Sequence, residues 1–361
     1  MPWSCDRTLE VVFWGAVSAL LAGLLHALGL LSCWVAFPPA WALSAGAAIA
    51  LSNITVSPSG KAVVVTGCDS GFGHSFALIL DKLGFRVFAG CLQADGEGAE
   101  HLRQEGSSRL HVLQMDVTSQ DQLDKAAQEV RRLLPHGEVL WGLVNNAGVS
   151  AFGEVEWVPI TVYKRTAEVN VFGLIAVTKT FLPFIRRAKG RLVVMSSVGG
   201  IMGRERLSPY NLTKFAIEGF SDSLRQEMKA WGVTVSLVEP ANFTAATNIA
   251  TEEHVEAQMK KMWAAMDEDV QTDYGKDYFD SVIKGFKANS KSGHDDMTPV
   301  LQAMTEALMQ RFPRARYRVL DTYYFFKLIA AVHFPEWLFD LLYVTTPRKL
   351  KENDNTHRKR D

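Results

Sequence analysis

Charges of opposite sign nearly cancel in this chain of 361 residues, and cysteine is scarce. Lys and Arg total 38 against 39 for Asp and Glu, so the formal net charge is −1. A balance so close to zero gives no electrostatic basis for nucleic-acid binding. The four cysteines, Cys5, Cys33, Cys68 and Cys91, lack the spacing of a metal site or a disulfide framework. We therefore expect neither a nucleic-acid partner nor a bound metal.

The N-terminal region also lacks charge, and it predicts a membrane anchor at residues 1–58. No Asp, Glu, Lys or Arg lies between Glu10 and Lys61. Residues 11–37 form an apolar run long enough to span a bilayer, and Pro38-Pro39 is expected to end it. Residues 40–56 form a shorter stretch rich in Ala and Ser. This stretch is expected to be either a second span or an interfacial or re-entrant segment.

The anchor is expected to remain on the mature protein. A cleaved signal peptide has a shorter apolar stretch and a basic leader, and a transit peptide is rich in Arg and poor in acids. Here the leader holds Arg7 beside Asp6 and Glu10, and the next Lys or Arg is Lys61. Both kinds of cleaved segment are therefore disfavoured.

From Lys61 onwards short β-branched runs alternate with helical patterns. The expected strands are residues 62–66, 86–89, 110–115, 140–144, 191–195 and 234–238, and the expected helices include 76–83, 120–134, 161–187 and 209–231. Strands that alternate with helices imply a parallel sheet covered on both faces. We expect one α/β domain of the doubly wound, Rossmann type at residues 59–320.

The C-terminal part departs from this alternation. Residues 249–318 are predicted to be mostly helical, and residues 321–361 hold an aromatic segment and a basic tail. Because Pro335 interrupts residues 323–343, that segment is expected to line a lipophilic pocket or to rest on a membrane surface. The tail (residues 348–351 and 357–360) is expected to be solvated or weakly attracted to anionic lipid.

The turn after the first expected strand is rich in glycine. It reads Gly67-Cys68-Asp69-Ser70-Gly71-Phe72-Gly73. Glycines here permit a tight turn and a close approach of backbone to a pyrophosphate, and the next helix offers its N-terminus to the negative charge. Placed between a first strand and a first helix, the motif predicts a dinucleotide site.

A second motif suits proton transfer. Tyr210 and Lys214 are four residues apart and share one helix face, and Ser197 precedes them. A neighbouring ammonium favours the phenolate form of tyrosine, which otherwise has a pKa near 10. Such a tyrosine can exchange a proton with an alcohol or carbonyl oxygen, and Ser197 can hydrogen-bond the same oxygen.

With these motifs the sequence from about residue 61 to 343 resembles the short-chain dehydrogenase/reductase family. The resemblance implies a catalytic set of Asn170, Ser197, Tyr210 and Lys214, in which Asn170 holds a water of a proton relay. It also implies that Lys214 binds the nicotinamide ribose and Asp116 the adenine. The expected cofactor contacts are Gly67, Asp69, Ser70, Gly71, Phe72, Gly73, Asp116, Asn146, Ala147, Gly148, Tyr210, Lys214, Pro240 and Thr244.

The segment after the sixth expected strand departs from the family pattern, and the charges near the second expected strand predict the cofactor. Ala241 replaces the usual glycine after Pro240, and Ala245 replaces an expected threonine, so Thr244 or Thr247 is the substitute for contact with the nicotinamide amide. No cation lies at the end of the second strand, where a 2′-phosphate would bind, and Asp69 lies in the loop. NAD is therefore favoured over NADP, with Asp69 and Asp95 as candidate ribose ligands.

The expected reaction is reversible NAD-linked oxidation of a secondary alcohol to a ketone. Residues 67–73, 141–173 and 242–280 resemble the hydroxybutyrate dehydrogenases of the family. The apolar N-terminus and residues 204–207 resemble its membrane-bound 17β-hydroxysteroid dehydrogenases, and retinol dehydrogenases are more distant. Arg204 or Arg206 could bind a carboxylate substrate, or both could be solvated. The alternatives are a steroid or retinoid substrate, favoured by the aromatic C-terminus, and a catalytically silent nucleotide-binding scaffold.

The remaining expectations concern location and assembly. We expect membrane lipid as a partner, a homo-oligomer, and residence in the endoplasmic reticulum or the mitochondrial inner membrane. Glycosylation sequons begin at Asn53, Asn211 and Asn242. A glycan at Asn211 or Asn242 would obstruct the expected active site, so the domain is expected to face the cytosol or the mitochondrial matrix.

Overall fold

Seven parallel strands form the centre of the molecule in a computed structural model that describes residues 5–247, 249, 251–290 and 292–344. The order across the sheet is β3-β2-β1-β4-β5-β6-β7. The strands are β1 (Lys61–Thr66), β2 (Arg86–Cys91), β3 (Leu110–Gln114), β4 (Val139–Asn145), β5 (Arg191–Met195), β6 (Thr234–Pro240) and β7 (Arg316–Val319). The order reverses direction between β1 and β4, which is where a doubly wound sheet binds its ligand. The expected fold class is confirmed.

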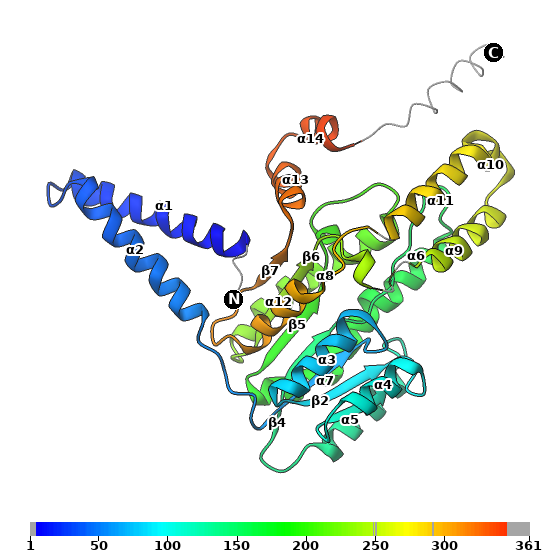
Figure 1. Cartoon of the computed structure of the whole chain (residues 1–361), viewed down its shortest axis with the longest axis horizontal. Coiled ribbons are helices and arrows are strands. Elements are labelled where there is room, and N and C mark those ends of the chain that lie inside the picture. Colours follow the sequence, from blue (N-terminus) through cyan, green and yellow to red (C-terminus); the bar gives the residue numbers. More distant parts are fainter. Residues whose placement is uncertain (1–4, 248, 250, 291, 345–361) are drawn as a thin grey trace.

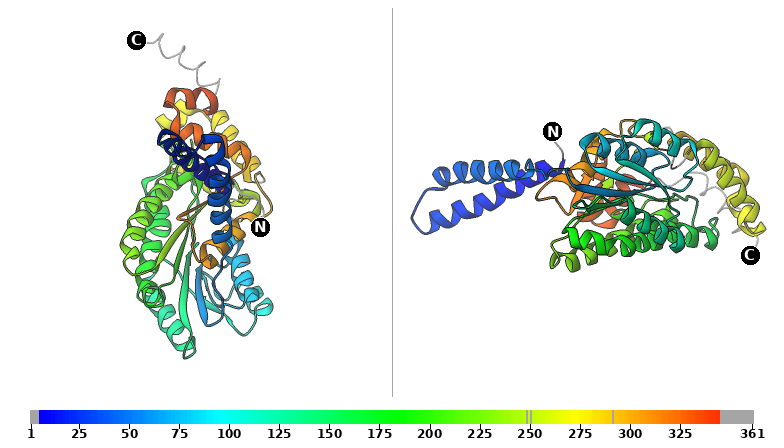
Figure 2. Two further views of the ribbon diagram at one scale, coloured as in Figure 1. Left: turned by 90° about the vertical axis from the view of Figure 1, so that its left-hand side faces the viewer. Right: turned by 90° about the horizontal axis from the view of Figure 1, so that it is seen from below.

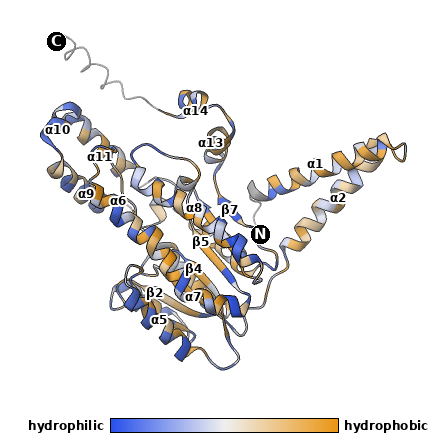
Figure 3. Ribbon diagram, turned by 180° about the vertical axis from the view of Figure 1, so that it is seen from behind, coloured by the Kyte–Doolittle hydropathy of each residue, from blue (hydrophilic) through white to orange (hydrophobic). Residues whose placement is uncertain are grey.

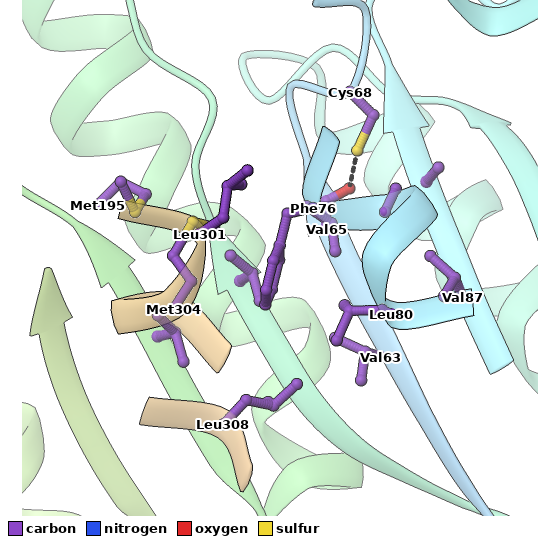
Figure 4. Close-up of a cluster of buried hydrophobic side chains, with 14 of the residues drawn as sticks. Val63, Val65, Cys68, Phe76, Leu80, Val87, Met195, Leu301, Met304 and Leu308 are labelled. Carbon is purple, nitrogen blue, oxygen red and sulfur yellow. Dashed lines mark hydrogen bonds between the residues drawn. The ribbon is translucent and has the colours of Figure 1, made fainter. Parts of the chain in front are cut away.

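Helices cover both faces of the sheet (Figure 1). One face holds α3 (Gly71–Leu83), α4 (Glu97–Glu105) and α12 (Thr298–Met309), and the other holds α5 (Gln120–Leu133), α7 (Leu174–Ala188) and α8 (Ser208–Lys229). Side chains of a strand alternate between faces, so Val63 and Val65 of β1 pack with Phe76 and Leu80 of α3 (Figure 4). Ala62 and Val64 enter the core on the opposite face. Both faces are buried, as the near-continuous apolar strands predict.

The strand and helix positions expected from the sequence agree with the structure, with two omissions. All six expected strands and the expected helices at α3, α5 and α8 are present within a few residues. Expected helix 161–187 is divided into α6 (Ile160–Ala167), a π-helical turn at Glu168–Gly173 and α7. Helix α4 and strand β7 were not expected, and β7 lies in a stretch that the sequence indicated to be helical.

A separate helical unit covers the carboxyl ends of the strands. It consists of α9 (Glu252–Ala265), α10 (Glu268–Tyr274) and α11 (Lys276–Ser290), which enclose a second apolar core around Trp157, Met259 and Phe279. Beyond β7, α13 (Thr322–His333) and α14 (Glu336–Tyr343) meet at Pro335, where the sequence predicted an interruption. The basic tail lies outside the described residues.

The apolar N-terminus is a hairpin of two antiparallel helices, α1 (Cys5–Ala27) and α2 (Cys33–Ser52), that projects from the domain (Figure 2). The expected end of the first helix at Pro38-Pro39 is wrong, because both prolines lie inside α2. The break falls at residues 28–32, where Gly29 adopts a positive φ of 69°. Apolar helices tolerate proline when a neighbouring helix packs beside them, as α1 does here.

The hairpin joins the domain at the amino ends of the strands. The chain after α2 pairs with the segment between α12 and β7: Thr55 bridges Gln310, and the Val56 N–H donates to the Met309 carbonyl over 2.8 Å. Lys61 then begins β1. Contacts therefore cross the boundary that the sequence suggested at residue 58.

Candidate active site

A cavity of about 860 Å³ opens at the carboxyl ends of the strands, beside the reversal point between β1 and β4. Volumes of this order are typical of cofactor and ligand sites. All the residues expected to form the site line this cavity except Gly73 and Asn170. Residues that lie far apart in the sequence are thus brought together at one cavity, as expected.

The glycine-rich turn is built so that side chains are excluded. Gly67 and Gly71 have φ values of 70° and 62°, which favour glycine. A Cβ at Gly73 would lie 2.3 Å from the Gly67 carbonyl oxygen. Asn146 closes the turn from β4, because its Nδ2 donates to the carbonyl oxygens of Thr66 (2.9 Å) and Gly67 (3.1 Å). The turn is a backbone cradle whose shape fits the pyrophosphate of a dinucleotide.

A carboxylate occupies the end of β2. The two oxygens of Asp69 accept hydrogen bonds from the backbone N–H groups of Leu92 and Gln93, each at 2.9 Å. Asp116 also lines the cavity, and it accepts from the N–H and hydroxyl of Thr118 at 2.9 and 2.7 Å. Asp95, the other candidate ribose ligand, does not line the cavity.

The Ser, Tyr and Lys side chains meet at the inner end of the cavity. Ser197 follows β5, and its hydroxyl accepts from the Gly199 N–H over 3.1 Å. Tyr210 and Lys214 lie on one face of α8, with Lys214 Nζ at 5.5 Å from the Tyr210 ring centroid. Lys214 Nζ donates to the Met195 carbonyl oxygen over 2.8 Å. The spacing in the sequence therefore produces the expected cluster.

The electrostatics of this cluster differ from the sequence argument in one respect. Burial raises the pKa of Tyr210, while the hydrogen bond with Ser197 and the charge of Arg204 lower it. Burial also lowers the pKa of Lys214 to about 8, against an opposing contribution from Glu218. Lys214 was expected to favour the Tyr210 phenolate, but its ammonium donates to the Met195 carbonyl, and burial is the largest influence on the pKa of Tyr210. The pKa of Tyr210 therefore lies above its ordinary value.

Asn170 lies in the π-helical turn and is 1% exposed. Its side-chain oxygen accepts from the Val149 N–H at 2.8 Å, and its amide donates to the Val149 carbonyl and the Thr213 hydroxyl at 2.9 and 3.0 Å. The amide is thus occupied in holding the backbone beside Gly148. Both amide N–H groups are used, so a relay water at this side chain would have to donate to the second lone pair of Oδ1.

Of the two candidate arginines, only Arg204 lines the cavity. Arg206 has a positive φ of 61°, and its guanidinium contacts Glu154 (2.8 Å) and the Tyr278 hydroxyl (3.3 Å). This pairing fixes the loop to α11 and leaves Arg206 outside the cavity lining. Arg204 does line the cavity, and no ion pair joins it to any described carboxylate. Its guanidinium lies 6.0 Å from the Tyr324 ring centroid.

The segment after β6 supplies the last expected contacts. Pro240 and Thr244 line the cavity, but the Thr244 hydroxyl already donates to Asn242 Oδ1 over 2.7 Å. Thr247 lies against the glycine turn, where a Cβ on Gly71 would be 3.7 Å from its side chain. Both threonines remain candidates for the contact made by the family's threonine.

Sequence reasoning missed the apolar wall of the cavity. Phe152, Leu207, Val255 and Phe286 line the cavity, and the ring centroids of Phe152 and Phe286 lie 4.7 Å apart. These residues come from two loops, α9 and α11, which are remote in the sequence. No local signal in the sequence distinguished these apolar residues from core residues.

The comparison with known proteins agrees with the family resemblance of the sequence motifs. A family model described as short chain dehydrogenase matches residues 61–256. The chain belongs to the short-chain dehydrogenase family. As a short-chain dehydrogenase it is an oxidoreductase, and the scaffold alternative is not supported.

Three similar proteins illustrate the range of this family. The mitochondrial D-beta-hydroxybutyrate dehydrogenase of Rattus norvegicus is 47% identical over 79% of this chain and 84% of its own length. Estradiol 17-beta-dehydrogenase 2 of Mus musculus is 42% identical over 71% of this chain and 67% of its own length. A short-chain dehydrogenase structure from Streptomyces avermitilis has a TM-score of 0.60 at 25% identity, covering 84% of this chain and 100% of that chain.

Proposed function

We propose that this short-chain dehydrogenase oxidises the secondary alcohol of a small hydroxy acid, with 3-hydroxybutyrate as the first candidate, and uses NAD. The observation that carries the proposal is Arg204, a cation in the cavity without a protein carboxylate as partner. Its charge reaches Tyr210, since it lowers the pKa of that phenol. A carboxylate bound to Arg204 would place the rest of a short substrate near the Tyr210 hydroxyl.

The glycine turn, Asp69 and Asp116 would hold the dinucleotide, with Lys214 at the nicotinamide ribose and Thr244 or Thr247 at the amide. Bound nicotinamide supplies the hydride acceptor. Ser197 would hydrogen-bond the substrate oxygen, and Tyr210 would take the alcohol proton as general base. The Lys214 ammonium and the positive charge of an oxidised nicotinamide would both favour the tyrosinate.

NAD is favoured over NADP by the charges around β2. The Asp69 carboxylate lies at the end of the strand, where a 2′-phosphate would meet a negative charge. The nearest cation on α4, Arg103, donates to the Ala94 carbonyl, pairs with Glu100 and does not line the cavity.

The position of the cavity also favours a water-soluble substrate. The hairpin joins the domain at the amino ends of the strands, whereas the cavity lies at their carboxyl ends. Figure 2 shows the hairpin and the helices around α10 at opposite ends of the molecule. A substrate entering from solution therefore has a shorter path than one entering from lipid around the hairpin.

A lipophilic alcohol is the second candidate. The wall formed by Phe152, Val255 and Phe286 is apolar, and estradiol 17-beta-dehydrogenase 2 is among the relatives. The test is a substrate panel on the purified full-length protein with NAD and NADP, comparing 3-hydroxybutyrate, estradiol and retinol. Turnover of 3-hydroxybutyrate with the highest kcat/KM supports the proposal, and turnover of estradiol or retinol alone contradicts it.

We further propose three functional regions: the anchor at 1–58, the dehydrogenase domain at 59–320 and the C-terminal segment at 321–361. Membrane association is supported by the apolar hairpin, whose helices are both long and apolar enough to cross a bilayer. Residence in the endoplasmic reticulum or the mitochondrial inner membrane, and assembly into a homo-oligomer, are part of the proposal.

A further inference from the structure

Where α1 and α2 face each other, their polar groups form hydrogen bonds between the two helices. The hydroxyls of Ser18 and Ser44 lie 3.2 Å apart, and the Trp41 indole donates to the Val11 carbonyl oxygen over 3.0 Å. Gly15 lies against the Trp41 ring, where an added Cβ would be 3.2 Å from Nε1. Small residues and interhelical hydrogen bonds at a helix contact are typical of packing inside membranes.

The outer surface has no protein partner among the described residues. Leu20, Trp34 and Leu43 are 76%, 90% and 77% exposed, and most of the hairpin ribbon has the colours of hydrophobic residues (Figure 3). Helices that are apolar all round are typical of membrane spans. Because residues 7–27 and α2 are 21 and 20 residues long, each extends about 30 Å, which matches the hydrocarbon thickness of a bilayer. Lipid hydrocarbon is the occupant that fits this surface.

The start of α1 is fixed to the catalytic domain. Arg7 is 8% exposed, and its guanidinium lies 3.8 Å from the Glu306 carboxylate on α12. One turn later, Glu10 lies 3.6 Å from the Arg314 guanidinium, just before β7. A helix that began on the far side of a bilayer could not make these contacts. The N-terminal end of α1 and the domain must therefore lie on one side.

A third apolar helical stretch, Ile160–Ala188, is also long enough to span a membrane. It differs from the hairpin because α7 packs Val177, Phe181 and Ile185 against the sheet. Its apolar side chains are thus accounted for by the domain core, and it adds no crossing.

We propose that α1 and α2 cross the bilayer twice as an antiparallel pair, so that the N-terminus and the catalytic domain lie on the same side. The turn at residues 28–32 then reaches the opposite interface. A single anchor followed by a surface segment would place the N-terminus on the side opposite to the domain. This inference concerns topology and does not depend on the substrate or the cofactor.

Epitope tags on the full-length protein test the topology in sealed membrane vesicles. One tag is fused at the N-terminus, a second is inserted after Gly29, and the domain is followed with an antibody. Protease should degrade the N-terminal tag and the domain together and should leave the Gly29 tag intact until the vesicles are permeabilised. Protection of the N-terminal tag while the domain is degraded would overturn the two-pass topology. Degradation of the Gly29 tag together with the domain in sealed vesicles would also overturn it, because the hairpin turn would then lie on the same side as the domain.

A deletion of residues 33–52 provides the matched control, since it leaves one apolar helix and is expected to protect the N-terminal tag. A resident protein of the vesicle interior reports that the vesicles are sealed. Dehydrogenase activity, measured in parallel, shows whether a failure concerns the topology alone. Retained activity with a protected N-terminal tag would refute this inference and leave the proposed function intact.

Discussion

Replacement of Arg204 with Gln should selectively weaken the use of a carboxylate substrate. Arg204 lines the cavity without a competing carboxylate, so a bound hydroxy acid would receive a charge-assisted hydrogen bond. Such bonds contribute about 1.5–3 kcal/mol, which corresponds to a fall in kcat/KM of about 10- to 150-fold. Arg204→Lys keeps the charge but not the planar fork, so it should lose less.

The assay must separate this effect from a second one. Because Arg204 also lowers the pKa of Tyr210, its removal should slow oxidation of every alcohol and shift the ascending, acidic limb of the pH profile to higher pH. The decisive quantity is therefore kcat/KM for 3-hydroxybutyrate divided by kcat/KM for 2-butanol, an uncharged secondary alcohol, measured over pH 6–10. The ratio should fall in Arg204→Gln. An unchanged ratio, with equal losses on both substrates, would refute carboxylate binding by Arg204.

Three further predictions concern the cofactor, the glycine turn and the anchor. The protein should prefer NAD to NADP by at least tenfold in kcat/KM, about 1.4 kcal/mol, and Asp69→Arg should narrow or reverse that preference; equal use of both by the wild type would contradict the charge argument. Gly73→Ala should lower the melting temperature and weaken NAD binding, because its Cβ would lie 2.3 Å from the Gly67 carbonyl oxygen. Gly219→Ala on α8 has open space around the added Cβ and should raise the free energy of unfolding by about 0.5–1 kcal/mol. Similar changes in melting temperature for the two variants would contradict the close packing of Gly73 in the glycine turn. Removal of residues 1–52 should yield a more soluble protein that still binds NAD. This protein should be more stable to heat than one that lacks residues 1–58, because only the protein that begins at residue 53 keeps the pairing of residues 54–56 with 309–311. Equal melting temperatures of the two truncated proteins would show that this pairing contributes nothing.

The sequence alone was sufficient for six of the seven strands and for the position of the cofactor turn. Strands such as β1 and β5 are continuously apolar because both faces of a parallel sheet are covered. Strand β7 escaped detection because it has only four residues and two are arginines. Arg316 and Arg318 pair with the buried carboxylate of Glu239 on β6, at 3.0 and 3.2 Å. A strand whose charges are neutralised by a distant partner cannot be distinguished from a loop by periodicity.

The site was predictable where neighbouring residues act together and unpredictable where distant ones do. The four-residue spacing of Tyr210 and Lys214 fixes their common helix face. Whether Arg204 or Arg206 enters the cavity depends on Glu154 and Tyr278, which hold Arg206 away from it. Likewise, Pro38 and Pro39 remain helical only because α1 packs beside α2. These outcomes depend on tertiary contacts that no local pattern reports.

The most direct test of the account is the separation of chemistry from cofactor binding in Tyr210→Phe. The substitution removes only the hydroxyl that would carry the proton, and it leaves the glycine turn, Asp69 and Lys214 in place. NAD affinity, measured by titration calorimetry, should stay within about threefold of wild type, a change of less than 1 kcal/mol. The kcat for 3-hydroxybutyrate should fall to about 1% or less, because general acid–base catalysis contributes 10²- to 10⁴-fold. A variant that binds NAD normally and retains more than a few per cent of kcat would show that Tyr210 does not transfer the proton.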